Sequence, residues 1–394
     1  MDPIRNPFAP GAGSQPPELA GRSQIIKDAN IAIQRVIMNR YDRSQMILGL
    51  RGVGKTVLLN KIQELAESHG HFTSLIEAQD QKSLSDMLVP KINQTLMRLS
   101  NYECAKICVT SAFRALRSFV SKFNVSISSS IAIEFEAERG IADSGNLELD
   151  LPELFERIGI AAREAGKAWT LLIDEVQYLQ TDDLSALIVA IHRISQKKLP
   201  VLFFGAGLPQ TAALSGDAKS YAERLFAYPQ VDALREEDAM DAIRAPLDRE
   251  NVQIEKEALN EIVKITHGYP YFLQEWGSHA WAIAENDLIT LQDVQQATHE
   301  AIQSLDNGFF KVRFDRLTPK EREYLQAMSS LGKGPYRSSD VASRLRKDTQ
   351  SLGPCRAQII SKGMIYSPAY GDIDFTVPLF DEYLRRNFPF NDLP

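Results

Sequence analysis

The chain has 394 residues, which is enough for two or three domains of ordinary size. Its composition, 44% hydrophobic and 24% charged, is that of a globular protein, and no apolar run approaches the about 20 residues that cross a bilayer. The formal net charge of −7 argues against a surface coated in nucleic acid, although a local basic patch remains compatible with it.

The cysteine content and the N-terminal sequence predict a cytoplasmic protein. The three cysteines, Cys104, Cys108 and Cys355, do not form a disulfide framework, so we expect them to be reduced. The N-terminus lacks the charged segment followed by an apolar one that a secretory signal needs.

The first elements in chain order are an arm and a helix. Residues 1–20 are rich in proline and glycine, which predicts an irregular N-terminal arm. A helix is expected over about residues 23–39, with Ser23 as its N-cap.

A phosphate-binding motif follows. It reads Gly49-Leu50-Arg51-Gly52-Val53-Gly54-Lys55-Thr56, after the apolar run at 46–48 and before a helix expected at 55–68. This is a complete P-loop, whose glycines let backbone N–H groups point at phosphate oxygens beside the positive end of the helix. Lys55 would reach the β- and γ-phosphates and Thr56 would bind Mg²⁺. The motif therefore predicts a nucleoside triphosphate with Mg²⁺ as the ligand.

The next segments predict a parallel sheet. Apolar strands are expected at 46–49, 72–77, 171–173 and 201–204, and they alternate with helices at 55–68, 83–99 and 151–165. Short, wholly apolar runs are typical of buried central strands. Strands that alternate with helices predict a doubly wound α/β domain, in which the sheet is flanked by helices.

Two adjacent carboxylates end one of these strands. Asp174 and Glu175 follow the run Leu171-Leu172-Ile173, so they lie at the carboxyl edge of the sheet, where α/β proteins bind ligands. Asp174 would hold Mg²⁺ through water, and Glu175 would polarise the water that attacks the γ-phosphate.

An insertion interrupts the alternation near residues 100–140. Residues 104–122 predict an amphipathic helix, and residues 124–136 alternate with period two, which is typical of a hairpin. Between residues 91 and 122 there are six basic residues and one acidic residue, Glu103; the basic ones are Lys91, Arg98, Lys106, Arg114, Arg117 and Lys122. A solvated helix face and a contact with nucleic acid or a partner both explain this pattern.

The C-terminal third is predicted to be helical at first and then to contain both helices and strands. Residues 233–312 read as a purely helical lid. Beyond them, helices at about 318–331, 339–346 and 354–362 and a hairpin at 364–377 predict a winged helix. Thr318 and Glu321 form a capping-box pattern at the start of the first of these helices.

The charges of this module leave its role open. Residues 316–394 contain twelve Lys and Arg against nine Asp and Glu, a net charge of about +3. The third helix offers Arg356, Gln358 and Lys362 to a partner, but Asp372 and Asp374 on the wing would repel phosphates. Contact with DNA and an interaction module that rests on the lid are both compatible with these residues.

With these motifs the chain resembles the AAA+ ATPases, in the branch shared by origin-recognition-type ATPases and STAND signalling ATPases. Gly21-Arg22 matches the Gly-Arg element that precedes the P-loop and lies near the adenine in that branch. Gly268-Tyr269-Pro270 resembles the Gly-x-Pro element of STAND proteins, whose proline packs on the base. The resemblance therefore implies that Gly21, Arg22 and Pro270 contact the nucleotide.

The same resemblance implies a trans-acting residue and a domain plan. Residues 220–225 are similar to the segment that carries an arginine finger, which would be Arg224 presented by a neighbouring copy in a homo-oligomer. The expected domains are an arm at 1–20, an AAA+ core at 21–232, a lid at 233–312 and a winged helix at 313–394.

Two departures from the family pattern predict slow turnover. The strand at 201–204 ends in Gly205-Ala206-Gly207 without the usual polar sensor, for which Gln210 or Thr211 is the nearest substitute. The lid after Gly268 also lacks the arginine that many AAA+ lids direct at the γ-phosphate. We therefore expect an ATP-binding, slowly hydrolysing switch that engages double-stranded DNA or a protein partner, or alternatively a STAND-like signalling or scaffold ATPase without DNA contact.

Overall fold

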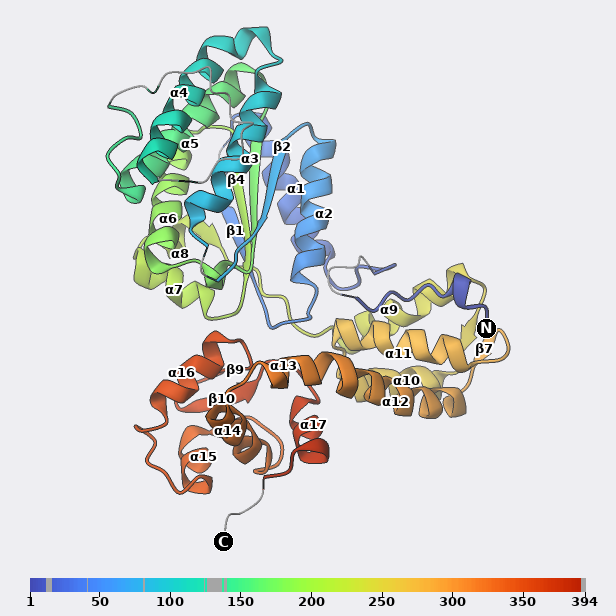
Figure 1. Ribbon diagram of the computed structural model, residues 1–394. Coiled ribbons are helices and arrows are strands. Elements are labelled where there is room, and N and C mark those ends of the chain that lie inside the picture. Colours follow the sequence, from blue (N-terminus) through green and yellow to red (C-terminus); the bar gives the residue numbers. More distant parts are fainter. Residues whose placement is uncertain are drawn as a thin grey trace. The chain divides into compact units, whose positions relative to one another are not determined.

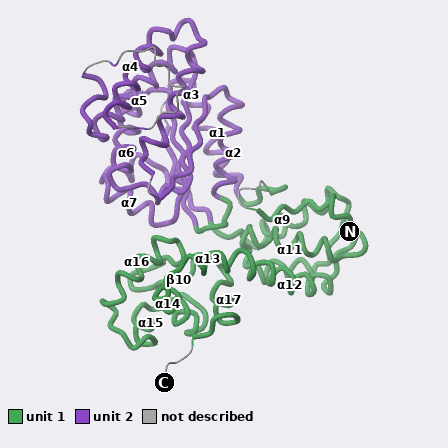
Figure 2. The backbone as a smooth tube through the Cα atoms, in the orientation of Figure 1, with its two compact units in different colours: residues 1–21, 50–54, 232–394 green, residues 22–49, 55–231 purple. Residues whose placement is uncertain are grey.

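The computed structural model describes residues 1–390 except 12–15, 41, 81, 124, 126–136 and 138–139. The chain forms two compact units (Figure 2). Unit 1 contains residues 1–21, 50–54 and 232–394, and unit 2 contains residues 22–49 and 55–231. The middle of the P-loop thus groups with the C-terminal part of the chain, whereas the residues on both sides of it belong to unit 2.

Unit 2 is built on a five-stranded parallel sheet with the strand order β2-β3-β4-β1-β5. The strands are β1 (Ser44–Leu48), β2 (Phe72–Glu77), β3 (Trp169–Asp174), β4 (Val201–Gly207) and β5 (Phe226–Ala227). The strands β1, β3 and β4 are buried along their whole length, as the apolar runs within them predict. This sheet confirms the expected α/β fold class of the core.

Helices cover both faces of this sheet (Figure 1). The helices α1 (Ser23–Ile37) and α2 (Lys55–Ser68) lie on one face. The other face carries α3 (Leu84–Leu99), α4 (Lys106–Phe123), α5 (Leu147–Glu164) and α6 (Thr181–Gln196), and the short helices α7 (Thr211–Ala218) and α8 (Ala222–Leu225) precede β5. The hairpin expected at 124–136 falls outside the described residues, apart from Val125. Arg22, not Ser23, is the N-cap of α1, because Ser23 already has helical geometry.

The first part of unit 1 is a helical bundle with a small strand pair. It contains α9 (Glu236–Arg249), α10 (Lys256–Thr266), α11 (Pro270–Ile283) and α12 (Leu291–Leu305). The two-residue strands β6 (Gln253–Ile254) and β7 (Leu288–Ile289) pair in parallel. The expectation of a purely helical lid was therefore wrong at these four residues, which are too few to give a period-two signal.

The N-terminal arm packs on α11 of this bundle. The amino group of Met1 donates to the carbonyl of Ala284 over 2.5 Å, and the indole N–H of Trp281 donates to the carbonyl of Asp2 over 2.8 Å. Phe8 is buried against Gly277, where an added Cβ would come within 2.6 Å of its ring. The arm thus contributes an aromatic side chain to the core of the bundle, which its proline-rich composition did not predict.

The second part of unit 1 contains three helices followed by paired strands. A π-helix at Asp306–Phe310 and α13 (Lys311–Asp315) lead into α14 (Pro319–Ser329), α15 (Ser338–Arg344) and α16 (Gly353–Ser361). The strands β8 (Tyr336–Arg337), β9 (Ile365–Tyr366) and β10 (Asp372–Phe375) form an antiparallel sheet in the order β8-β10-β9, before α17 (Phe380–Asn387). The capping box of Thr318 and Glu321 is confirmed. The assignment of this part as a winged helix stays a prediction.

Aromatic side chains join the two parts of unit 1. Phe310 of the π-helix lies 5.6 Å from Phe380 and 5.3 Å from Tyr383, measured between ring centroids. Arg386 of α17 forms an ion pair with Asp306 over 2.8 Å. Aromatic ring pairs at such distances each contribute about 1 kcal/mol beyond their buried area. The π-helix is therefore held between the helical bundle and α17.

All three tryptophans are buried and hydrogen-bonded. The indole of Trp169 on β3 donates to Ser74 over 3.0 Å, and that of Trp276 on α11 donates to Thr298 over 2.9 Å. Trp281 bonds the N-terminal arm.

Among the described residues, every helix is too short or too polar to cross a membrane.

A buried histidine makes unit 2 sensitive to acid. His71 contacts the hydroxyl of Thr170 over 2.8 Å and the carbonyl of Ile33 over 3.1 Å. Burial lowers the pKa of His71 to about 4, and the nearby His69 acts in the same direction. The folded protein therefore keeps this imidazole neutral at a pH at which the unfolded chain binds a proton.

We expect the free energy of unfolding to fall as the pH falls from 6.5 towards 4. For a histidine pKa of 6.5 in the unfolded chain and about 4 in the folded one, the loss between pH 7 and pH 5 is about 2 kcal/mol. Urea unfolding at both pH values measures it, and His71→Gln should show a smaller difference between them. An equal pH dependence in the variant would remove His71 as the cause.

Candidate nucleotide-binding site

In unit 2, the side chain of the P-loop lysine is hydrogen-bonded to the first residue of the loop. Lys55 is the first residue of α2, and its ammonium donates to the carbonyl of Gly49 over 2.9 Å. The side chain is only 5% exposed. A buried ammonium is costly unless anions or hydrogen-bond acceptors surround it, so this position suits a phosphate ligand.

The hydroxyl of Thr56 and the carboxylate of Asp174 meet directly. The Thr56 hydroxyl donates to Asp174 Oδ2 over 2.6 Å, although the two residues come from α2 and from the end of β3. Burial raises the pKa of Asp174, while the hydrogen bond from Thr56 opposes the shift. Mg²⁺ prefers oxygen ligands of this kind, and a divalent cation favours the ionised carboxylate. The pair therefore fits the magnesium role predicted for it.

Glu175 has a backbone conformation that is uncommon for its residue type. Its φ of 54° and ψ of 40° lie in the left-handed region, and its N–H donates to Asp174 Oδ1 over 2.8 Å. The amide of Gln177 donates to the Glu175 carboxylate, and Gln177 Oε1 accepts the N–H of Leu208 over 3.1 Å. Gln177 thus links Glu175 to the end of β4. We did not single out Gln177 in the sequence, where its position two residues after Glu175 was the available signal.

Thr211 is the better placed of the two candidate sensor residues. Its side chain is fully buried, and a Cβ added to Gly207 would lie 2.5 Å from its hydroxyl oxygen. Among the described residues, this hydroxyl has no hydrogen-bond partner. Gln210 is partly exposed at the N-cap of α7. The Thr211 hydroxyl can therefore still form a hydrogen bond at the end of β4, as a sensor residue would need to.

In unit 1, the N-terminal end of α11 contacts the middle of the P-loop. Gly52 has a φ of +79°, and a Cβ added there would lie 2.6 Å from the hydroxyl oxygen of Tyr269. Arg51 reaches the turn after α16, because a Cβ added to Gly363 would lie 2.7 Å from its Nε. Only glycine at position 52 allows the tyrosine to approach the loop this closely.

The residues implied by the family resemblance are spread over both units. In unit 1, Gly21 lies beside Leu234 and Asp238, and Pro270 is the first residue of α11. In unit 2, Arg22 is the N-cap of α1, and Arg224 is exposed on α8. Their predicted roles towards the nucleotide, and the finger role of Arg224, stay predictions.

Two family models match the chain. Residues 18–204 match the AAA ATPase domain, and residues 307–384 match a domain of unknown function (DUF8462). The chain is 23% identical over 345 residues to an uncharacterised HTH-type transcriptional regulator of Methanocaldococcus jannaschii, and the match covers 83% of this chain and 78% of that protein.

Two solved structures share the fold. A Walker-type ATPase of Pyrococcus abyssi is 15% identical with a TM-score of 0.60, and the match covers 93% of this chain and 96% of that one. Cdc6p of Pyrobaculum aerophilum is 14% identical with a TM-score of 0.50, and the match covers 97% and 96%. The predicted resemblance to AAA+ ATPases is thus confirmed over residues 18–204, which match the AAA ATPase domain, and the Pyrococcus abyssi ATPase shares the fold.

We expect Gly52→Ala to destabilise the nucleotide-free protein more than Gly54→Ala. Both glycines have positive φ, so alanine is strained at either position, but only the Cβ at position 52 meets Tyr269. The clash should add about 1–3 kcal/mol, a usual cost of overpacking. Urea unfolding of both variants measures the difference, and equal losses would contradict the close contact with Tyr269.

Proposed function

We propose that the protein is a slow ATPase switch, which binds ATP with Mg²⁺ and couples its nucleotide state to binding of double-stranded DNA or a protein partner. The hydrogen bond between Thr56 and Asp174 carries this proposal. It brings together the hydroxyl that follows the P-loop lysine and the carboxylate that ends β3, and these two oxygens are the expected Mg²⁺ ligands.

Each residue of the site has its own role in binding or hydrolysis. Lys55 and the backbone N–H groups of residues 50–54 bind the phosphates, and Thr56 and Asp174 hold Mg²⁺. When bound, Mg²⁺ neutralises charge on the phosphates. Glu175 accepts a proton from the attacking water, and Gln177 orients its carboxylate.

In this proposal ATP hydrolysis is slow, and a second copy of the chain contributes a residue to the site. Gly205-Ala206-Gly207 offers no polar side chain at the end of β4, which leaves the buried hydroxyl of Thr211 as the available sensor. Arg224 is exposed, so a neighbouring copy could present it to the γ-phosphate in a homo-oligomer that forms at least transiently.

The free cysteines support a cytoplasmic location.

Basic residues in both units provide candidate DNA contacts. On α4, Arg114 is exposed and Arg117 is half-buried. The Methanocaldococcus jannaschii relative is described as an HTH-type transcriptional regulator, which supports a DNA contact by the C-terminal part. The phosphate backbone of DNA would be attracted to these cations in a salt-dependent way.

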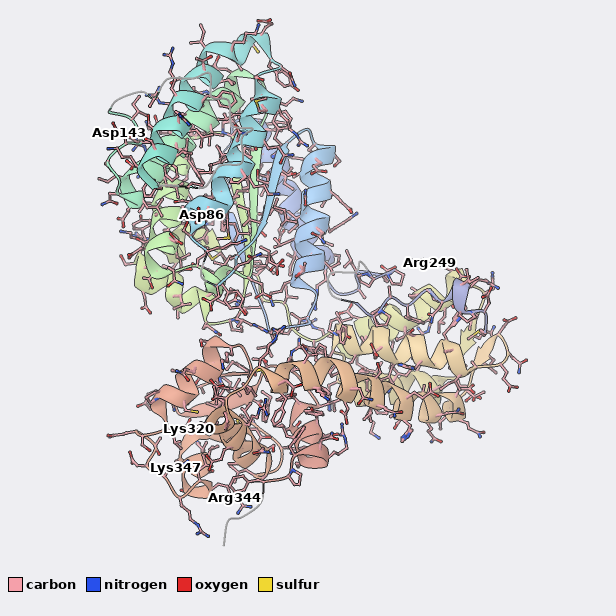
Figure 3. The ribbon with its side chains drawn as sticks, viewed as in Figure 1. Asp86, Asp143, Arg249, Lys320, Arg344 and Lys347 are labelled. Carbon is pink, nitrogen blue, oxygen red and sulfur yellow. The ribbon has the colours of Figure 1, made fainter. Side chains whose placement is uncertain are left out.

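The contacts of α16 favour the second candidate, a signalling or scaffold ATPase without DNA contact. Arg356 donates to the hydroxyl of Ser338 over 3.0 Å, and Lys362 pairs with Glu321 over 2.7 Å. Figure 3 shows Lys320, Arg344 and Lys347 on the same part of unit 1. Of these, Lys347 pairs with Glu323, and Arg344 lies 5.1 Å from the ring centroid of Phe390. Cations that are already engaged contribute less to phosphate binding.

Steady-state ATP hydrolysis with and without double-stranded DNA separates the two candidates. If DNA is the partner, it should stimulate hydrolysis at low salt, and the stimulation should fade at physiological salt. Replacing Lys91, Arg98, Arg114 and Arg117 together by glutamine tests the α3–α4 surface, and retained stimulation would exclude it as the contact. Slow hydrolysis that is indifferent to DNA would favour the signalling ATPase.

Glu175→Gln should bind ATP but fail to hydrolyse it, because the amide cannot accept the proton of the attacking water. A loss of about 10²-fold or more in kcat, with nucleotide affinity retained, is expected for a general base. Lys55→Ala serves as the contrasting variant and should lose nucleotide binding. Normal turnover in Glu175→Gln, or retained ATP affinity in Lys55→Ala, would contradict these roles.

A further inference from the structure

A cavity of about 320 Å³ lies within unit 1. The P-loop, the helical bundle and the C-terminal sheet each supply lining residues, among them Leu50, Tyr269 and Asp374. All of its lining residues belong to unit 1, which Figure 2 shows in green. Pockets for small molecules begin at about 300 Å³, so this cavity suits a small ligand.

Carboxylates outnumber cations on the wall of this cavity. The acidic lining residues are Asp232, Asp374, Asp381 and Glu382, and the single lining lysine is Lys333. With His267 neutral, four negative charges and one positive charge give a formal charge of −3. A wall of this sign repels phosphate groups and attracts cations. The cavity is therefore unsuited to the phosphates of a nucleotide.

Asp374 is a half-buried carboxylate that faces no cation. It accepts the N–H of Phe375 over 2.8 Å, and among the described residues it forms no ion pair. Its neighbour Asp381, in contrast, pairs with Arg385 over 2.7 Å. Burial raises the pKa of Asp374, and the charge of Asp381 acts in the same direction. Burial of an unpaired carboxylate is costly, and a bound cation would offset this cost.

Two tyrosines flank this carboxylate. Tyr366 lies opposite Asp374 in the pairing of β9 with β10, and both Tyr366 and Tyr336 line the cavity. Burial raises the pKa of both tyrosines, and the charge of Asp374 acts in the same direction. A Cβ added to Gly334 would overlap Asp374 Oδ1 and lie 2.7 Å from Tyr336 Cε2, so this glycine leaves room beside the carboxylate. Aromatic rings next to a carboxylate suit an organic cation.

The wall at Tyr269 has a different electrostatic environment. Tyr269 is 2% exposed, and among the described residues its hydroxyl has no hydrogen-bond partner. Burial raises the pKa of Tyr269, and the positive charges of Arg313 and Arg51 oppose this shift. These arginines disfavour a second cation near Tyr269, whereas a neutral hydrogen-bonding group would satisfy its hydroxyl.

We propose that this cavity binds a small organic cation. Its ammonium or guanidinium group lies at Asp374, beside Tyr336 and Tyr366, and its neutral, hydrogen-bonding remainder faces Tyr269. The inference goes beyond the proposed function, because this ligand is neither the nucleotide nor a macromolecule. Since the ligand contacts three segments of unit 1, its binding stabilises their packing and raises the unfolding temperature.

The test is to titrate the full chain, without nucleotide, with 4-amino-1-butanol and with its uncharged counterpart 1,4-butanediol. Isothermal titration calorimetry gives the affinity, and thermal unfolding gives the stabilisation. We expect the amino alcohol to bind and the diol not to bind. Asp374→Asn should lower the affinity for the amino alcohol about 10-fold or more, because it removes a charge-assisted hydrogen bond but keeps an acceptor for the N–H of Phe375.

Asp372→Asn is the matched control on the same strand. Asp372 pairs with Arg337 over 3.1 Å and lies outside the lining of the cavity. This variant therefore makes the same change in charge two residues from Asp374 and should keep the wild-type affinity. Equal binding of the diol, an unchanged affinity in Asp374→Asn or an equal loss in both variants would overturn the proposal.

Lys333→Gln gives a test of opposite sign, which also serves if Asp374→Asn fails to fold. Lys333 is exposed, so its replacement leaves the core intact. The variant removes the lysine of the cavity wall, and the affinity for the amino alcohol should rise about 2- to 5-fold, the range expected for an exposed charge. An unchanged or lower affinity in Lys333→Gln would contradict a cation site.

Discussion

The structure of unit 2 depends on a buried lysine and a buried aspartate at the carboxyl edge of one parallel sheet. Lys55 and Asp174 are each at most 6% exposed, and isolated burial of either charge would cost several kcal/mol. The carbonyl of Gly49 and the hydroxyl of Thr56 supply hydrogen bonds that offset part of this cost. The strand order brings these groups together, since β4 lies between β1 and β3 and all three run in the same direction. The cost of burying these two charges at this edge is consistent with the phosphate and Mg²⁺ ligands that we propose for it.

The residues of the P-loop are divided between the two units. Its first residue and its last two belong to unit 2, whereas residues 50–54 belong to unit 1 with the lid and the C-terminal part. In unit 1, Gly52 contacts Tyr269, and Arg51 contacts the turn at Gly363 after α16. Under the proposed function, a change in loop conformation on binding phosphate would reach the turn that follows α16, the helix that we expected to contact a partner.

The sequence was most informative where function requires consecutive residues. The P-loop, Asp174-Glu175 and the capping box at Thr318 could be predicted because each is a local pattern with a local physical cause. The contact of Arg51 with the turn at Gly363 could not, because a single arginine in a loop carries no signal of a partner more than 300 residues later. The docking of Phe8 on Gly277 was missed for the same reason. Its proline-rich surroundings indicate irregular backbone but give no information on burial.

The placement of the three tryptophans has an optical consequence. Trp169 is the single indole in unit 2, where it packs against Phe155 at the start of β3. Trp276 and Trp281 share α11 in unit 1, and the second of them is hydrogen-bonded to the N-terminal arm. Intrinsic fluorescence of the whole chain is therefore weighted towards α11 and the arm. Replacing Trp169 by phenylalanine would leave an emission spectrum that reports on unit 1 alone, with no added dye.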